Sequence, residues 1–376
     1  MALSLENSFG SSAPSISRPR VSLRLIDPWL VAAVGGLCSI GITMVYSATR
    51  EGLRQGASDP YLFAKKQLMF MAIGVVVMVV TALIDYRNLL DLSPALYMGS
   101  IVALLGVFLV PAHKGAHGWY AIGAFQLQPA EFAKIVMILT LAAYGSAQRN
   151  ELDVRRFVLV LTITAIPTML IYLQPDLGSA LVFLVIVVVM LWVAGAKGAH
   201  LLGLAVTGIV AMVVTVKLGI LKDYQVKRLT GFIDGSYNVT QSKIAIGSGG
   251  LSGKGLFEGT QTKYRFLPER HTDFIFSVVG EQLGFIGGFC VLLLFALLCW
   301  RLYRIGTTSS DSAGTLICGG VLALFLFQIF ENVGMTLGIM PVTGIPLPFL
   351  SYGGSSTIVA FVAIGLVASV RVHRFR

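Results

Sequence analysis

"GSALVFLVIVVVMLWVAG", residues 178–195, carries no charged side chain over its whole length. A helix rises about 1.5 Å per residue, so roughly 20 apolar residues cross the ~30 Å hydrocarbon core of a bilayer. Similar apolar stretches lie near 27–48, 66–84, 92–111, 130–147, 154–172, 199–217, 274–300, 313–337 and 352–370. Only helices and closed barrels span lipid. The pattern therefore predicts an all-α polytopic membrane protein with ten transmembrane helices.

The composition excludes a soluble protein, because 56% of the 376 residues are hydrophobic and only 12% are charged. Residues 1–24 are polar and lack the apolar core of a signal peptide, so we expect a disordered cytoplasmic tail. Residues 25–376 are expected to form a single ten-helix membrane domain. The cysteines all fall inside predicted spans without metal-type spacing, and we interpret them as buried apolar residues: Cys38, Cys290, Cys299 and Cys318.

The distribution of Lys and Arg predicts the orientation. An even number of spans places both termini on one side. That side carries Arg18, Arg20, Arg24, Arg87, Arg149, Arg155, Arg156, Lys197, Arg301, Arg304, Arg371, Arg374 and Arg376, against Arg50, Arg54, Lys65, Lys66 and Lys114 in the short loops opposite. Both termini are therefore expected in the cytoplasm. The loop at about 218–273, between spans seven and eight, then lies outside, and its many basic residues indicate a function rather than topology.

Two outer segments are rich in Gly or Pro, at 241–261 and 338–356. Pro341, Pro346 and Pro348 exclude a regular helix in the second. Irregular backbone at membrane depth is tolerated only beside protein or a watery cavity, so we expect both segments to line a cavity that opens outward. The first is not a nucleotide phosphate loop, because Ser248 and Gly255 stand where Gly and Ser or Thr are required. A cradle of N–H groups for a phosphate and a plain flexible loop both remain open.

Several charged residues lie at or inside predicted spans. Glu131 and Lys134 are three residues apart, on one helix face, so they form either a structural ion pair or part of a polar cavity. Asp176 precedes a span, where it is either a helix cap or a cavity residue. For Glu281 and Glu331, hydrogen bonding between helices is favoured over chemistry.

The pair His113 and His117 has helical spacing, but Gly115 lies between them in a loop. A metal site there is not favoured.

Asp273 differs from these residues because it stands at the water boundary, just before the span 274–300. Arg270, three residues upstream, would hold its pKa down or bind an anion beside it. The alternative is that Thr272 or Asp273 caps the helix. One carboxylate, a basic loop and an outward cavity are the parts needed to deprotonate an attacking hydroxyl while a phosphate-bearing group departs.

Six segments together resemble the SEDS family, named for shape, elongation, division and sporulation. They are "MVYSATR" (44–50), "QPAEFAK" (128–134), "QPDLGSA" (174–180), "QSKIAIGSGGLSGKGLFEGTQ" (241–261), "FLPERHTDFIFSVVGEQLG" (266–284) and "PVTGIPLPFLSYGGSS" (341–356). The resemblance runs from the first span to the last. Within the family, 244–250 and 266–276 look more like the elongation branch, RodA, than like the division branch, FtsW.

The resemblance implies a ten-span glycosyltransferase of cell elongation that polymerises lipid II at the outer face of the bacterial plasma membrane. It implies a class B penicillin-binding protein and other elongation-complex membrane proteins as partners, and no nucleic acid. The family's essential aspartate falls on Asp273, and its fourth-span pair falls on Glu131 and Lys134. The family usually has "GEELG" where this chain has Gln282, so a second acid is not needed there.

The implied chemistry is a single displacement, since an α-linked donor yields a β-1,4 glycan. Pyrophosphate is a good leaving group, so one base and positive charge suffice, unlike the two carboxylates of glycosidases. We assign Asp273 as the base. Candidates for holding the pyrophosphate are Lys134, Arg270, Arg50 and Lys254. Mg²⁺ or another divalent cation would do the same work, and the sequence identifies no certain cofactor.

Two other readings compete. A flippase for lipid-linked precursors would share the cavity and the basic lining, but it predicts alternating access and gives Asp273 no special part. No convincing inverted repeat supports it. A scaffold that only positions a partner enzyme would have little use for Glu131, Lys134 and Asp273 beside lipid.

Overall fold

The structure is a computed structural model, and it describes residues 27–50, 59, 61–110, 118–122, 125–146, 154–217 and 236–374. Ten helices coincide with the ten predicted spans: α1 (Pro28–Arg50), α2 (Leu62–Leu83), α4 (Ser93–Gly106), α5 (Pro129–Ser146), α6 (Val154–Leu173), α7 (Leu177–Val193), α8 (Gly198–Lys217), α12 (Ile275–Thr307), α13 (Ser312–Leu337) and α14 (Gly354–Val372). The all-α fold class is confirmed, and the count of ten membrane-crossing helices stays a prediction. The predicted tail at 1–24 and the pair His113 and His117 lie outside the described residues.

Six of these helices, α1, α2, α6, α12, α13 and α14, are long and apolar enough to cross a membrane. The helix α7, residues Gly198–Gly208 of α8 and the segment Ser93–Leu109 form shorter apolar helices. The chain is therefore a multi-pass membrane protein. A short helix, α3 (Tyr86–Asp91), lies between the second and third predicted spans; Asp85 caps it, and Pro94 stands in the first turn of α4.

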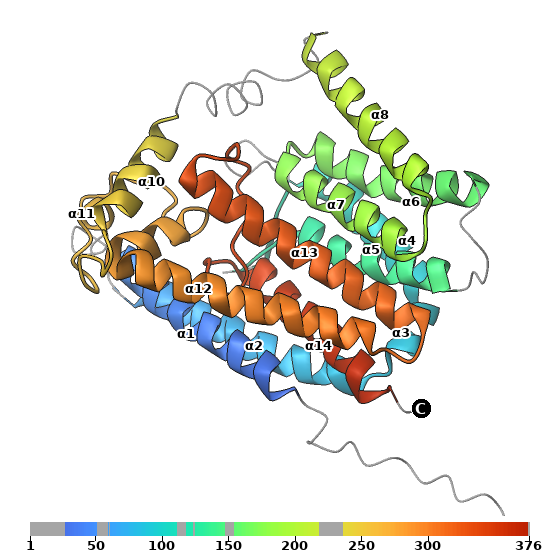
Figure 1. Ribbon diagram of the computed structural model, residues 1–376, viewed down its shortest axis with the longest axis horizontal. Helices are drawn as coiled ribbons and strands as arrows, with labels where there is room; N and C mark the ends of the chain where they lie inside the picture. Colours follow the sequence, from blue (N-terminus) through green and yellow to red (C-terminus); the bar gives the residue numbers. More distant parts are fainter. Residues whose placement is uncertain are drawn as a thin grey trace, which may run out of the picture.

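The helices α13 and α14 occupy the middle of the bundle (Figure 1). The first packs against α5, α7 and α12, and the second packs against α2. Small residues allow the α2–α14 approach: a Cβ on Gly74 would lie 2.2 Å from the Phe361 ring, and one on Gly365 would lie 2.7 Å from the Met78 carbonyl oxygen. Close backbone packing at glycine is a usual way for helices to associate in lipid.

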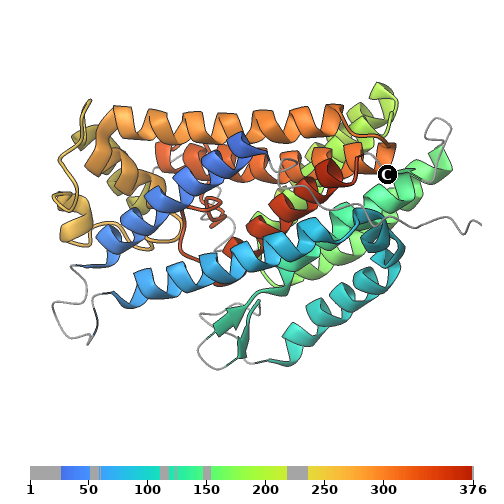
Figure 2. The same ribbon diagram turned by 90° about the horizontal axis from the view of Figure 1, so that it is seen from below.

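Peripheral elements flank this core. The antiparallel hairpin of β1 (Tyr120–Ile122) and β2 (Phe125–Leu127) pairs Tyr120 with Leu127 and lies at the edge of the bundle (Figure 2). The helix α8 contacts α7 and leans away from the other helices (Figure 1).

The two ends of the described chain meet. The Asp27 carboxylate, directly before α1, accepts hydrogen bonds from Arg301 at the end of α12 and from Arg371 at the end of α14. Both ends therefore lie on one side of the bundle, as predicted. Their position in the cytoplasm stays a prediction.

The described part of the outer loop begins with a helix, α10 (Tyr237–Ser248). Ser236 caps it by accepting from the Val239 N–H at 3.4 Å. The expectation of irregular backbone throughout 241–261 was therefore wrong. The physical reason is local: residues 237–246 contain neither Gly nor Pro, and they directly follow a good cap residue.

The glycine-rich stretch 249–255 packs backbone against backbone on α12. A Cβ on Gly249 would lie 2.0 Å from the Gly280 carbonyl oxygen, and one on Gly253 would lie 2.1 Å from the Gln282 carbonyl oxygen. The N–H groups of 254 and 255 donate to the carbonyls of 281 and 282 at 3.0 and 3.1 Å. These donors are used inside the fold, so neither the phosphate cradle nor the plain flexible loop is correct.

Candidate active site

The backbone that joins α13 to α14 is non-helical from 339 to 353, as the prolines predicted. Gly344 within it has φ 78°, a conformation that glycine adopts without strain. The short helix α11 (Thr260–Lys263) and the segment 264–274 lead from the outer loop to the start of α12. The candidate site residues lie around the loop 339–353, which we call the α13–α14 loop.

Backbone hydrogen bonds fix the segment that carries Asp273. They run from the Tyr352 N–H to the His271 carbonyl (2.9 Å), from Ser351 Oγ to the Thr272 carbonyl (2.5 Å) and from Asn332 Nδ2 to the Asp273 carbonyl (2.8 Å). Asn332 Nδ2 also donates to the Ile345 carbonyl at 2.8 Å. Three consecutive carbonyls are thus held by α13 and by the α13–α14 loop.

The Asp273 side chain is half-buried at the start of α12, where the sequence predicted it. A Cβ on Gly344 would lie 3.5 Å from Asp273 Oδ2, so the carboxylate faces the α13–α14 loop. Phe274 is the N-cap of α12, and its side chain makes no cap hydrogen bond. Thr272 Oγ1 donates to the Glu269 carbonyl at 3.1 Å. The N-cap position is therefore occupied by Phe274 and not by Thr272 or Asp273.

Glu331 on α13 is a second carboxyl group beside the α13–α14 loop. Its side chain is fully buried, and Oε1 accepts a hydrogen bond from Thr343 in the α13–α14 loop. Oε2 is buried and has no hydrogen-bond partner among the described residues. The sequence analysis had favoured hydrogen bonding between helices for Glu331. The sequence signal for a site role was that this carboxylate stands in an apolar span just before the proline-rich loop.

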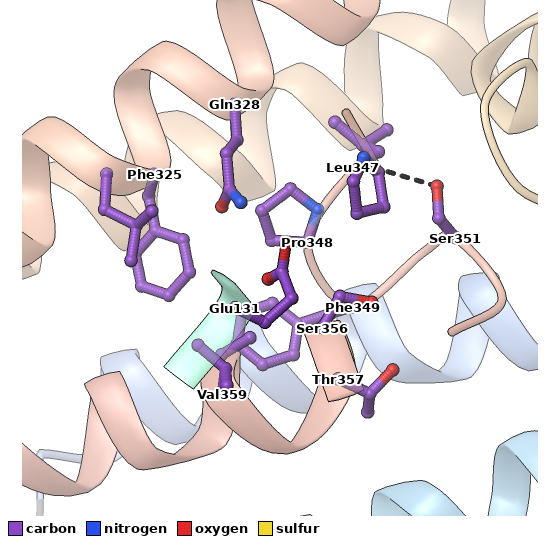
Figure 3. Close-up of a pocket in the computed structure, with 13 residues that line it drawn as sticks. Glu131, Phe325, Gln328, Leu347, Pro348, Phe349, Ser351, Ser356, Thr357 and Val359 are labelled. Atoms are coloured by element: carbon purple, nitrogen blue, oxygen red, sulfur yellow. Dashed lines mark hydrogen bonds between the residues drawn. The ribbon is translucent and has the colours of Figure 1, made fainter. Parts of the chain in front are cut away.

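Glu131 and Lys134 form a buried ion pair in the first turns of α5, with Lys134 Nζ 2.5 Å from Glu131 Oε1. Glu131 also lines a cavity of about 10 Å³, enough for one water, against Gln328 and the Pro346–Phe349 turn (Figure 3). Ser351 lines the same cavity and bonds to the Thr272 carbonyl. One serine thus joins the Glu131 pocket to the Asp273 segment.

Asp176 caps α7, as one reading of the sequence held, because its Oδ1 accepts from the Ser179 N–H at 2.9 Å. Its Oδ2 accepts from Gln128 Nε2 at 3.0 Å, which ties the start of α7 to the start of α5. A Cβ on Gly178 would lie 2.9 Å from the Thr343 carbonyl oxygen. The N-termini of α5, α7 and α12 therefore converge on the same loop.

Two of the four predicted cationic residues lie at the end of α1 nearest Asp273. Arg270 Nε donates to the Ala48 carbonyl at 2.7 Å, and Arg50 stacks over Phe257 with its guanidinium carbon 5.2 Å from the ring centre. Burial, and then the neighbouring Arg265, lower the pKa of Arg270 from its ordinary value. The guanidinium nevertheless stays cationic in water.

The other two cations are engaged in ion pairs. Lys134 pairs with Glu131, and Lys254 Nζ lies 3.7 Å from Glu281 Oε1 and 2.7 Å from Thr260 Oγ1. Glu281 also accepts from the N–H groups of 261 and 262 at 2.7 and 3.1 Å. It therefore holds α11 against α12, so hydrogen bonding is confirmed as its role.

Gln282 Oε1 accepts from Ser47 Oγ at 2.7 Å, which joins α12 to α1. This amide takes the place of the acid expected from the family pattern. Among the described residues, no three His, Cys, Asp or Glu side chains gather in a metal-binding cluster.

Comparison with known proteins agrees with this geometry. The family model described as cell cycle protein (FtsW, RodA, SpoVE) matches residues 28–375. Stage V sporulation protein E of Bacillus subtilis is 39% identical over 89% of this chain and 93% of its own length. Peptidoglycan glycosyltransferase MrdB of Escherichia coli is 34% identical over 93% and 94%. Peptidoglycan glycosyltransferase RodA of Treponema pallidum is 35% identical over 93% and 98%.

Solved structures show the same fold. A chain from a peptidoglycan synthase complex that coordinates polymerisation and crosslinking superposes with a TM-score of 0.78 at 31% identity, covering 93% of this chain and 98% of the other. Rod shape determining protein RodA of Thermus thermophilus superposes with a TM-score of 0.71, also at 31% identity, with the same coverage. Relatives named stage V sporulation protein E, RodA and FtsW match at 39%, 35% and 35% identity, so assignment to the elongation branch stays a prediction.

Proposed function

Because this chain belongs to the FtsW, RodA and SpoVE family of cell cycle proteins, we propose that it is a peptidoglycan glycosyltransferase. Its donor is lipid II, a disaccharide-pentapeptide on undecaprenyl pyrophosphate, and its product is a glycan strand at the outer face of the plasma membrane. The reaction inverts the anomeric centre of the donor sugar. Cell elongation is the process it serves.

The observation that carries this proposal is the placement of Asp273. Its carboxylate faces the α13–α14 loop at the start of α12. Asn332 holds its own carbonyl, and Ser351 and Tyr352 hold the carbonyls of the two preceding residues. A base must be held in place for proton transfer, since misplacement by an ångström costs much of the rate.

In the proposed reaction, Asp273 accepts the proton of the acceptor sugar's 4-hydroxyl as that oxygen bonds to the donor's anomeric carbon. The bond from the anomeric carbon to the pyrophosphate oxygen breaks, and undecaprenyl pyrophosphate leaves with the electron pair. A positioned general base of this kind contributes about 10²–10⁴-fold to the rate.

Positive charge on the departing pyrophosphate is the second requirement. Arg270 and Arg50 are the best candidates, because both lie at the outer end of α1 and neither forms an ion pair among the described contacts. Lys254 and Lys134 are already paired with buried glutamates. A divalent cation would be held chiefly by the pyrophosphate oxygens, with few protein ligands.

The proposed partner is a class B penicillin-binding protein that crosslinks the new strand. Similarity to a chain of a synthase complex that coordinates polymerisation and crosslinking supports this pairing.

The test is reconstitution of the purified chain with labelled lipid II, with and without the penicillin-binding protein. Long glycan on a gel is the expected product. Repeating the assay with a chelator decides between a metal ion and arginine, because only metal-dependent activity disappears. If no glycan forms but labelled lipid II crosses the vesicle membrane, the protein is a flippase and the proposal fails.

A further inference from the structure

An apolar groove of about 510 Å³ runs between α1 and α2, with α14 as its floor. Its walls include Val34, Gly35 and Cys38 of α1, Met71 and Val75 of α2, and Ile364 of α14. The groove lies at the opposite end of α1 from Arg50 and the candidate active site, where α1 and α2 separate in Figure 2. Its volume is in the range of small-molecule binding sites.

The groove is deeper than one leaflet of a bilayer but does not cover the whole hydrocarbon core. Its α1 wall extends from Leu30 to Ile42 and its α2 wall from Leu68 to Leu83, about 18 Å and about 22 Å of helix at ~1.5 Å per residue. Half of a ~30 Å hydrocarbon core is about 15 Å. A partner's transmembrane helix needs a surface along the whole thickness, whereas an acyl chain of one leaflet needs only this depth.

The end of the groove nearest the chain termini is charged. Asp27 and Arg371 line it there, and the buried Asp27 carboxylate also accepts from Arg301. Burial by itself raises the pKa of Asp27, but Arg301, the Leu30 N–H and Arg371 together hold it below its ordinary value. Asp27 is therefore ionised at neutral pH, and one carboxylate faces two guanidinium groups. The cluster keeps an excess of one positive charge.

We propose that this groove binds a phospholipid with an anionic headgroup. The lipid comes from the leaflet on the side of the chain termini. One acyl chain lies between α1 and α2, and the headgroup phosphate bonds to the remaining N–H groups of Arg371, whose side chain is 30% exposed. Such a lipid would join α1, α2 and α14 at the end far from the chemistry.

The test measures lipid binding to the purified, delipidated chain by native mass spectrometry, with phosphatidylglycerol and phosphatidylcholine that carry the same acyl chains. Wild type should prefer phosphatidylglycerol. Arg371→Gln should weaken phosphatidylglycerol about fivefold, the usual contribution of one basic residue near an anionic surface, and leave phosphatidylcholine unchanged. Arg371→Lys should restore most of the preference. Arg304→Gln, at an exposed position on α12, is the control and should bind as wild type.

Gly35→Leu tests the groove itself, because a Cβ there meets no atom within 4 Å and the larger side chain would fill the space. It should abolish binding of both lipids. Gly99→Leu is the matched control, since Gly99 also has open space but lies on α4. The proposal is overturned if Gly35→Leu binds lipid as well as Gly99→Leu does, or if wild type shows no headgroup preference. It also fails if Gly35→Leu keeps lipid but breaks a dimer, since the occupant would then be a second copy.

Discussion

Ser351 connects two parts of the candidate active site that are far apart in the sequence. Its Oγ accepts from the Leu347 N–H at 2.9 Å and donates to the Thr272 carbonyl at 2.5 Å. The residue is buried, so each lost bond leaves a polar group without compensation from water. Its effect on the reaction should act through the position of Asp273.

Ser351→Ala should lower the polymerisation rate about tenfold, since a shift of roughly 1.4 kcal/mol is typical of a buried hydrogen bond with an orphaned partner. Ser356→Ala is the control, because Ser356 lines the same cavity but bonds only to the Gly353 carbonyl, at 3.4 Å. Rates on lipid II with matched thermal melting check this. Equal rates for the two variants would contradict the anchoring role.

Lys134→Met should destabilise the protein by about 3–5 kcal/mol, because it leaves the buried Glu131 carboxylate without its partner. The double variant Glu131→Gln with Lys134→Met should recover most of the stability, as measured by thermal melting.

The activity of the double variant separates the two readings of this pair. A structural ion pair predicts that polymerisation returns together with stability. A pair that contacts substrate predicts a stable but inactive protein.

At this scale the sequence was informative where a charge stands alone in apolar surroundings. Asp176 and the pair Glu131 and Lys134 could be found in this way, whereas Asp273 was found by its place at the water boundary. Glu331 was expected to bond to another helix, but its partner Thr343 lies beyond the end of its own helix in an irregular loop. Local spacing rules cannot place a loop residue against a helix.

Among the elements, α12 shows how the outer loop is attached to the helix bundle. Gly284 interrupts it at φ 66° and ψ −162°, and a Cβ there would lie 2.3 Å from the Gly253 nitrogen. The break lets the N–H groups of 285 and 286 donate to the carbonyls of 250 and 251 at 2.9 and 3.1 Å. The outer loop is therefore attached to α12 by main-chain bonds.

Gly284→Ala should loosen this attachment, because the side chain strains a positive φ and clashes with backbone. We expect faster hydrogen exchange at residues 249–255 and reduced thermal stability. Gly288→Ala is the matched control: it lies one turn further along α12, and its nearest atom, Phe276 Cζ, is 3.6 Å away. If both variants exchange alike, the break does not hold the loop.

The main helices could be predicted from their apolar stretches, because lipid leaves the backbone few alternatives. The outer segment could not. A run of glycines indicates flexibility, a phosphate cradle or close backbone contact, and the choice depends on whether another backbone lies nearby. Here Gly249 and Gly253 meet the carbonyls of α12.

In the whole molecule, the ion-pair cluster around Asp27 closes the end of the bundle that carries both chain ends. It joins the start of α1 to the ends of α12 and α14. Because the folded state lowers the pKa of Asp27, its contribution to stability is present above the unfolded value of 3.8 and is lost as the pH falls through the folded value.

Melting temperature measured from pH 7 to pH 3 should therefore fall more steeply for wild type than for Asp27→Asn, which has no carboxylate to protonate. The variant should be less stable at pH 7, where it leaves two arginines without their acceptor. Parallel melting curves across this range would show that Asp27 does not stabilise the closure.

The sequence predicted only that the two chain ends share a side, and it did not predict which residues meet there. An even number of spans predicted that the ends share a side, and the contact between Asp27 and Arg371 confirms it. The identity of the contacting residues depends on helix tilt and rotation, which hydropathy does not specify.

The separation of substrate binding from turnover in Asp273→Asn tests the central claim most directly. The asparagine keeps the shape and the backbone bonds to Asn332, Ser351 and Tyr352 but cannot accept the proton. Lipid II affinity and melting temperature should stay near wild type, while polymerisation falls at least about 10²-fold. Glu269→Gln, an exposed carboxylate four residues earlier, should remain active. Normal polymerisation by a folded Asp273→Asn variant, or loss of binding in step with turnover, would contradict the assignment of Asp273 as the base.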